Sequence, residues 1–252
     1  MQVIGRMARN TWRGKTKGAS GQAKPNFVGW AMAEFILHIG NKAYSSWSLR
    51  GWLACKIAGL SFEESVHDLY AADWPAAARS ISPTGKVPAL HHQGRVVWES
   101  IAIIEHLADL NPQSGLWPDD PAARAHARAI SAEMHAGFVE LRRAMWMNVR
   151  RRFPGKGRTP GALADIARIT ALWRDARARF GAAGPFLFGA RLSGADAMYA
   201  PVAARFVTWA PDLPADAAAY VAAVWDHPFL REWRKGADAE TWVNPKFESP
   251  VD

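Results

Sequence analysis

The chain has 252 residues, of which 49% are hydrophobic and 21% are charged, and this balance is typical of an ordinary water-soluble globular protein. No apolar run approaches the roughly 20 residues that a membrane-spanning helix needs, so we expect no membrane association. The single cysteine, Cys55, excludes an internal disulfide and a zinc site of several thiolates, so we expect no metal and a reducing, cytoplasmic location.

The net charge of +8 is concentrated at the N-terminus. Residues 1–31 hold six Lys or Arg and no acidic residue, whereas the rest of the chain carries 25 basic against 23 acidic residues. We expect residues 1–33 to form a disordered basic extension. Three interpretations of this extension stay open: a targeting peptide, a tail that binds a polyanion, or translated sequence upstream of a natural start at Met32. Because the remainder is nearly neutral, we predict no nucleic-acid partner.

Residues 34–111 predict a compact α/β unit. The apolar run 35–39 ends at Gly40 and suits a buried strand, and the apolar positions 49, 52, 53, 57 and 60 have helical spacing that ends at Gly59. Residues 62–69 predict a second strand, and residues 73–86 hold at most a short helix. Two short strands, 87–92 and 95–100, flank a turn that contains Gly94, and a helix opens after Ser100.

A linker and a helical domain follow. Residues 111–121 hold three prolines and a glycine, and we place the linker at 112–120. Helical patterns then predict an all-helical domain over 121–240, with a tail at 241–252. The expected helices are a long one over 122–151, one over 159–180, one opened by a capping box of Ser193 and Asp196, and two more over 215–225 and 228–235.

This order of elements and four short motifs resemble the cytosolic glutathione transferases. YSSWSLR resembles the serine-bearing start of that family's first helix and is closest to the zeta class, although Trp47 stands where the zeta motif has cysteine. KVPAL followed by ES resembles the glutathione-binding segment, and LSGAD resembles the capping box of the sixth helix. The resemblance implies α/β plus all-α architecture, namely an N-terminal thioredoxin-like βαβββα domain followed by a C-terminal helical bundle. It also implies a homodimer that uses glutathione as co-substrate.

Glutathione carries two carboxylates, one amine and one thiol, and each has a candidate partner. A helix N-terminus and a hydroxyl donor both favour a thiolate, so the resemblance implies Ser45 as the group that contacts sulfur, with Ser46 as the second candidate. A plain helix cap is the alternative role for these serines.

The remaining glutathione contacts follow from the same resemblance. Val87, before a cis-Pro88, would pair its backbone with glutathione like an added strand. Ser100 and its helix N-terminus would hold the γ-glutamyl carboxylate, Glu99 would hold the ammonium group, and Lys86 would help with the glycine carboxylate. Each of these residues also has a purely structural alternative. Pro88 would then form a turn, Glu99 and Ser100 would cap the helix, and Lys86 would be solvated.

The second substrate is expected against the long helix after the linker. At helical spacing one face of that helix carries His135, Phe138, Arg142 and Met145. An apolar wall with an arginine would suit an electrophile that bears a carboxylate, and core packing with a solvated arginine face is the alternative. Cys55 lies inside the first predicted helix and reads as a packing residue.

The sequence therefore predicts a glutathione transferase that activates the glutathione thiol for attack on a small electrophile. A glutathione-dependent isomerase of the maleylacetoacetate type is the nearest alternative. A non-catalytic, transferase-like module that binds protein partners is the alternative from a different class. The electrophile and the transferase class stay open.

Overall fold

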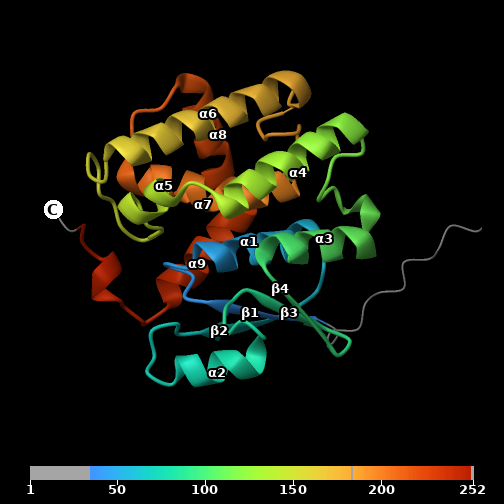
Figure 1. Ribbon diagram of the computed structural model, residues 1–252, viewed down its shortest axis with the longest axis vertical. Coiled ribbons are helices and arrows are strands. Elements are labelled where there is room, and N and C mark those ends of the chain that lie inside the picture. The colour runs from blue at the N-terminus through green and yellow to red at the C-terminus, as the bar shows by residue number, and fades with distance from the viewer. Residues whose placement is uncertain (1–34, 183, 251–252) are drawn as a thin grey trace, which may run out of the picture.

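The computed structural model describes residues 35–182 and 184–250, so the predicted extension at 1–33 lies outside the described residues. The first part, from residue 35 to residue 110, is a four-stranded sheet with its helices and is called the sheet region here. The second part, from residue 121 to residue 239, is helical and is called the helical region. Figure 1 shows the helical region stacked on the sheet region, with α1 and α3 between the sheet and the upper helices.

The sheet region has the predicted thioredoxin-like architecture. Its elements are β1 (Phe35–Gly40), α1 (Ser46–Ile57), β2 (Glu63–His67), α2 (Trp74–Ile81), β3 (Ala89–His92), β4 (Arg95–Trp98) and α3 (Ser100–Leu110). The sheet order is β2-β1-β3-β4; β1 and β2 are parallel and the other pairs are antiparallel. The hairpin turn is as expected, since Gln93 and Gly94 have φ values of 49° and 74°.

Different helices cover the two faces of the sheet. α1 and α3 lie on the face toward the helical region, whereas α2 covers the opposite face (Figure 1). Phe35, Leu37 and Ile39 alternate along β1 into the first face and are at most 1% exposed. Because α1 is enclosed between the sheet and the helical region, it is buried on nearly all sides. Cys55 lies fully buried in this core, which confirms it as a packing residue.

The face under α2 carries three histidines from three adjacent strands. His38 Nδ1 lies 3.1 Å from His67 Nε2, and the rings of His38 and His91 are 4.4 Å apart. Both neighbours contact α2: the His67 ring lies 5.1 Å from the Trp74 ring, and His91 Nε2 donates to the Ile81 carbonyl at 2.7 Å. Burial, with a smaller contribution from the nearby His91 and His67, lowers the pKa of His38 to about 4. His38 is therefore uncharged at neutral pH.

The helical region is built around α7. Its elements are α4 (Pro121–Ala136), α5 (Val139–Ala144), α6 (Pro160–Phe180), α7 (Gly194–Trp209), α8 (Ala215–Asp226) and α9 (Pro228–Ala239). Nearly every residue of α7 is buried, because this helix packs against α1, α4 and α8. Thr159 caps α6 as predicted, and the predicted capping box is present: the Ser193 backbone N–H donates to Asp196 Oδ2 at 2.8 Å.

The long helix predicted over 122–151 is wrong beyond Ala136. The helix α4 ends at Gly137, and Phe138 then adopts a left-handed conformation with φ of 61°. α5 spans only Val139–Ala144, and residues 145–159 form no helix. An isolated glycine within a helical pattern is a weak helix breaker. The helical spacing of the apolar residues continues past Gly137, so the sequence did not indicate that the helix ends there.

The C-terminal segment, defined here as residues 241–250, returns to the sheet region. It contains a short 3₁₀ turn, Pro245–Phe247. The ring of Phe247 lies 5.3 Å from the ring of Tyr44, 5.6 Å from Tyr70 and 6.2 Å from Trp146. Glu248 accepts a hydrogen bond from the Tyr44 hydroxyl at 2.6 Å. The segment thus joins the start of α1 to the irregular chain after α5.

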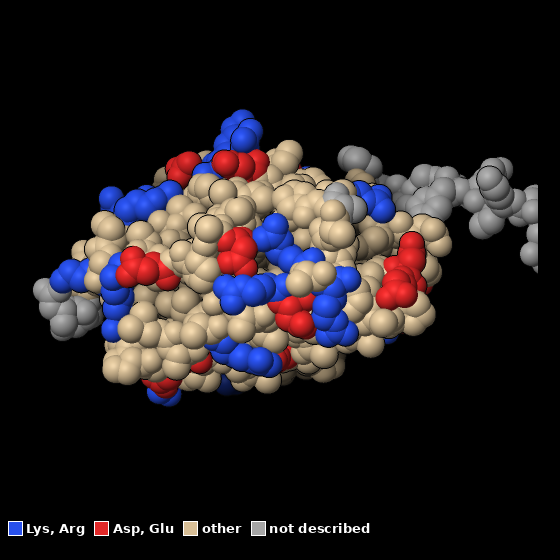
Figure 2. Space-filling model, turned by 90° about the horizontal axis from the view of Figure 1, so that it is seen from above, with Lys and Arg blue, Asp and Glu red and all other residues tan. Residues whose placement is uncertain are grey.

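The surface of the helical region carries charges of both signs. Figure 2 shows lysine and arginine interspersed with aspartate and glutamate on the face seen from above Figure 1. Across the described ranges, none of the helices combines the length and apolar character required to cross a bilayer.

Candidate functional site

Three segments of the chain meet at one edge of the sheet. His38 of β1 lies opposite Ala89 of β3, and Ala89 lies opposite Trp98 of β4. Because β3 runs antiparallel to both neighbours, β1 and β4 end at the edge where β3 begins. This edge gathers the six residues that flank those strand ends and that the sequence proposes for glutathione: Ser45, Ser46, Val87, Pro88, Glu99 and Ser100.

Ser45 is the N-cap of α1. Its Oγ accepts the backbone N–H of Ser48 at 3.3 Å and donates its own proton to Ser48 Oγ at 2.8 Å. Ser48 Oγ in turn accepts the backbone N–H of Gly40 at 2.9 Å, which ties the end of β1 to the start of α1. The capping role that the sequence offered as an alternative is therefore present at Ser45.

Ser46 is the first residue of α1 and has a different partner. Its Oγ accepts a hydrogen bond from Arg205 Nη2 at 3.2 Å. Arg205 belongs to α7, so a guanidinium of the helical region reaches the N-terminus of the first helix. Ser45 and Ser46 are each 8% exposed, and the N-terminus of α1 adds the partial positive charge of its free N–H groups.

The segment before β3 lies directly against α1. The Val87–Pro88 peptide bond is cis, as the sequence predicts. A Cβ placed on Gly51 would lie 2.9 Å from the ring carbons of Pro88, so glycine alone permits this close approach of helix and loop. Val87 lies two residues before Ala89, the first residue of β3 that pairs with β1. Lys86 is exposed.

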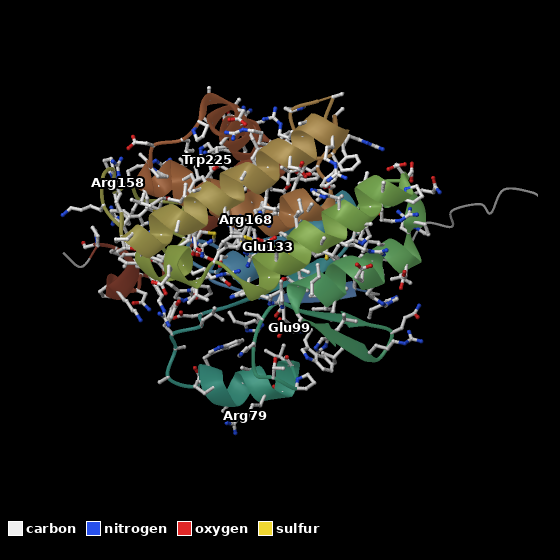
Figure 3. The ribbon with its side chains drawn as sticks, turned by 45° about the horizontal axis from the view of Figure 1, so that its top comes forward. Arg79, Glu99, Glu133, Arg158, Arg168 and Trp225 are labelled. Carbon is white, nitrogen blue, oxygen red and sulfur yellow. The ribbon has the colours of Figure 1, made fainter. Side chains whose placement is uncertain are left out.

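Glu99 and Ser100 connect β4 to α3. Glu99 has a strained backbone with φ of 68° and ψ of 126°, and strain of this kind concentrates at functional sites. Its carboxylate lies 3.5 Å from His135 Nε2, at the junction of the two regions (Figure 3). Ser100 is buried, and its Oγ lies 3.8 Å from Met198 Sδ. Its hydroxyl and the first N–H groups of α3 form a place suited to a carboxylate.

Two of the four residues proposed for the second substrate gather around Trp47. The His135 and Trp47 rings are 5.2 Å apart, and the Arg142 guanidinium lies 4.8 Å from the Trp47 ring centre. Burial lowers the pKa of His135, while the Glu99 carboxylate opposes that shift. The structure thus brings His135, Arg142 and Trp47 next to the proposed glutathione edge.

The proposed common helical face does not exist, because α4 ends before Phe138 and Arg142 lies on α5. Arg142 donates to the carbonyls of Met134 and Gly137, so it also closes the C-terminal end of α4. Met145 is fully buried and Phe138 is 8% exposed, so both side chains pack in the core.

Two buried arginines were missed by the sequence analysis. Arg50 is fully buried: its Nε donates to the Met198 carbonyl at 2.9 Å and its guanidinium lies 4.4 Å from the Trp47 ring centre. Within the described residues its Nη1 and Nη2 have no hydrogen-bond partner. Arg205 is 4% exposed. The sequence did hold a signal for Arg205, because it is a charged residue within an otherwise apolar helix. A charged residue that is buried usually has a specific partner, so this position could have been predicted to make a defined polar contact.

The arginines make this junction electropositive. No carboxylate forms an ion pair with Arg50, Arg142 or Arg205 in the part of the chain that the structure describes. Burial, together with the nearby Arg142, lowers the pKa of Arg205 to about 9, so Arg205 is still a cation at pH 7. An anion at this junction would relieve the cost of keeping these charges away from water.

Known proteins resemble both regions of the chain. A family model described as "Glutathione S-transferase, N-terminal domain" matches residues 44–110. The maleylacetoacetate isomerase of Rhizobium meliloti is 30% identical over 190 residues, which cover 68% of this chain and 82% of that relative. The chain belongs to the glutathione transferase superfamily.

Other members of the superfamily resemble this chain over different lengths. The probable maleylacetoacetate isomerase of Caenorhabditis elegans is 37% identical over 106 residues, so the match spans 42% of this chain and about half, 49%, of that relative. A crystal structure of a glutathione transferase homolog from Burkholderia, with bound glutathione, has a TM-score of 0.60 and 24% identity. It covers 82% of this chain and 99% of that protein, which shows that the two share a fold.

Proposed function

We propose that this protein is an enzyme that binds glutathione at the edge of the sheet and activates its thiol for attack on a small electrophile. The observation that carries the proposal is the meeting, at one edge, of the N-termini of α1 and α3 with the segment before β3. Glutathione needs an anion site, an extended backbone partner and a donor for sulfur, and this edge offers all three.

The contacts follow from the chemistry of each group. The γ-glutamyl carboxylate lies on Ser100 and the first N–H groups of α3, and Glu99 pairs with the ammonium group. The backbone of Val87 pairs with the peptide, and Lys86 approaches the glycine carboxylate. The sulfur then lies at the N-terminus of α1, next to the serine hydroxyls, in the domain that we place at residues 34–111.

The reaction is a nucleophilic attack by the thiolate. The sulfur forms a bond to an electrophilic carbon, and a leaving group departs with its electron pair. With a conjugated double bond the sulfur adds instead, and the neighbouring carbon takes a proton from water. Trp47, His135 and Arg142 border the second substrate, and the electropositive junction favours an electrophile that bears a carboxylate.

A glutathione-dependent isomerase is the second candidate, favoured by the relatives that are named maleylacetoacetate isomerases. Here the thiolate adds to a conjugated double bond, rotation follows about the new single bond, and expulsion of the thiolate gives the other geometric isomer. Trp47 replaces the cysteine of the zeta motif, so the second-substrate side of this site differs from that class.

We also propose a homodimer, as the superfamily resemblance implies, and a cytoplasmic setting, which the single buried cysteine supports. Sedimentation velocity tests the dimer, and fractionation of cells that produce the protein tests the setting.

Calorimetric titration with glutathione tests the proposed function. We expect saturable heat at millimolar glutathione or below, and turnover with an aryl halide or with maleylacetoacetate. The double variant S45A/S46A should still bind glutathione but lose roughly tenfold in turnover, the effect of raising the thiol pKa by about one unit. Binding without any turnover would support a non-catalytic module, and no heat of binding at all would overturn the proposal.

A further inference from the structure

Arg205 is a buried cation whose hydrogen-bond partners, among the residues that the structure describes, are all oxygen atoms of neutral groups. Its Nε donates to the Met145 carbonyl at 2.8 Å, its Nη1 to the Pro201 carbonyl at 3.1 Å and its Nη2 to Ser46 Oγ at 3.2 Å. The two carbonyls hold the guanidinium in place, and the third contact directs its charge at the hydroxyl of Ser46. Buried arginines are usually paired with a carboxylate, so an unpaired one aimed at a helix N-terminus requires an explanation.

The two adjacent serines use their protons differently. The Ser45 hydroxyl donates to Ser48 Oγ at 2.8 Å and accepts the Ser48 backbone N–H, so its hydrogen-bonding capacity is used inside the start of α1. The Ser46 hydroxyl accepts from Arg205, and no acceptor within the described residues takes up its proton. A hydroxyl that accepts from a cation is polarised, and it becomes a stronger donor to a third group.

We propose that Ser46, polarised by the buried Arg205, is the hydroxyl that donates to the glutathione sulfur, while Ser45 is the structural cap of α1. The inference rests on the proposed function, because it names which group of the same site stabilises the thiolate. The thiol proton passes to solvent water, and the negative charge that remains on sulfur is stabilised by the Ser46 hydroxyl, the helix N-terminus and the cation behind them. Arg205 does not touch the sulfur, so it is a positioning residue.

The neighbouring charges fit this assignment. The guanidinium groups of Arg50 and Arg142 lie 4.4 Å and 4.8 Å from the ring centre of Trp47, the residue after Ser46, and add positive charge to the junction. The thiolate would place a negative charge next to these arginines, in addition to the Glu99 carboxylate beside His135 and to Asp165, which acts on Arg142. The glutathione thiol and these cations would therefore stabilise one another, and binding of glutathione should be tighter when the thiol is ionised.

The test measures the pKa of the bound thiol from the ultraviolet absorbance of its thiolate, with the full-length protein saturated with glutathione. We expect Ser46→Ala and Arg205→Met each to raise this pKa by about one unit, which lowers the thiolate fraction about tenfold at pH values well below the wild-type pKa. Ser45→Ala should lower the melting temperature, because it removes a helix cap, and leave the pKa of the bound thiol where it is.

The double variant S46A/R205M tests whether Arg205 acts on the sulfur through the Ser46 hydroxyl or directly through its positive charge. If Arg205 acts through the hydroxyl, adding Arg205→Met to Ser46→Ala produces no further rise in the thiol pKa. Additive shifts, or a rise caused by Ser45→Ala and not by Ser46→Ala, would overturn the inference. Ser46→Ala removes a single side-chain oxygen, so if Arg205→Met does not fold, the pKa of the thiol bound to Ser46→Ala decides the question alone. Wild-type protein that binds no glutathione would refute the proposed function itself, which is a distinct outcome.

Discussion

Ser45, Ser46 and Ser100 are three hydroxyls at helix N-termini, yet each contacts a different group. Their positions were predicted from the sequence, because serine before a helical pattern is a strong local signal. Their partners were not, since Arg205 lies 159 positions away from Ser46 along the chain and Met198 lies 98 positions from Ser100. Local patterns locate a helix start, whereas tertiary packing decides what its hydroxyl does.

Ser100 is expected to contribute to glutathione affinity and not to thiol activation. Replacing Ser100 with alanine removes a hydroxyl that would donate to the γ-glutamyl carboxylate, so we expect about tenfold weaker binding. The pKa of the bound thiol should stay the same. Calorimetry on Ser100→Ala measures the affinity, and Thr159→Ala, which removes a helix cap in the helical region, is the matched control. Equal affinity of Ser100→Ala and wild type would contradict the placement of the carboxylate.

At the scale of elements, helix starts were easier to predict than helix ends. α6 and α7 begin where Thr159 and the Ser193–Asp196 pair indicate, because a side chain that bonds backbone N–H groups is visible in the sequence. The end of α4 was missed, since Gly137 and the left-handed Phe138 leave no strong stop signal. The arginine that closes this end, Arg142, was instead assigned to a continuous helical face.

The capping box of α7 should be a large contributor to stability. Asp196 is fully buried and accepts from the Ser193 hydroxyl at 2.7 Å, the Leu187 N–H at 3.1 Å and the Tyr220 hydroxyl at 3.0 Å. Asp196→Ala leaves these donors buried without a partner, and we expect a loss of about 3 kcal/mol or more in the free energy of unfolding. Urea denaturation measures it. Ser193→Ala, which removes one of the donors, should cost about 1 kcal/mol, and equal losses for both variants would be inconsistent with this account.

The histidine cluster under α2 predicts an acid-sensitive sheet region. The folded state keeps His38 neutral down to about pH 4, whereas the unfolded chain protonates it near its ordinary value of 6.5. The unfolded state therefore binds more protons between these values, so the stability present above pH 6.5 is lost as the pH falls toward 4. Allowing for solvent screening of a half-buried group, we expect a loss of about 1 to 2 kcal/mol.

Thermal melts between pH 7 and pH 4 check this expectation, with His38→Gln as the comparison. The variant should show a shallower decline of melting temperature than the wild type. An identical decline in both proteins would place the acid sensitivity elsewhere in the molecule.

At the scale of the whole molecule, the C-terminal segment and the contact of α1 with α7 join the sheet region to the helical region. The sequence predicted both regions and their order, because the stretch 111–121, with its three prolines and a glycine, separates a strand-bearing pattern from a purely helical one. The sequence did not predict how the two regions pack against each other. Tyr44 contacts Phe247 and Glu248, which lie about 200 residues further along the chain. Docking depends on shape and on long-range pairs, neither of which leaves a local pattern.

Phe247 should stabilise the assembled molecule. Its ring fills the space between Tyr44, Tyr70 and Trp146, so Phe247→Ala removes contacts with both regions at once. We expect about 2 kcal/mol lower stability, the lower end for a large aromatic that is only half-buried. Urea denaturation measures the change, and Val243→Ala, an exposed position in the same segment, is the control that should change little. Matching losses in the two variants would show that the ring is not the anchor.

Cys55 gives the molecule a built-in reporter of unfolding. It is the only cysteine in the sequence, it is fully enclosed in α1, and burial raises the pKa of its thiol, so a maleimide dye has nothing to react with while the fold is intact. Each labelling event therefore counts one opening of the central helix, and a second cysteine engineered at any surface position can carry a fluorophore without background from the native one.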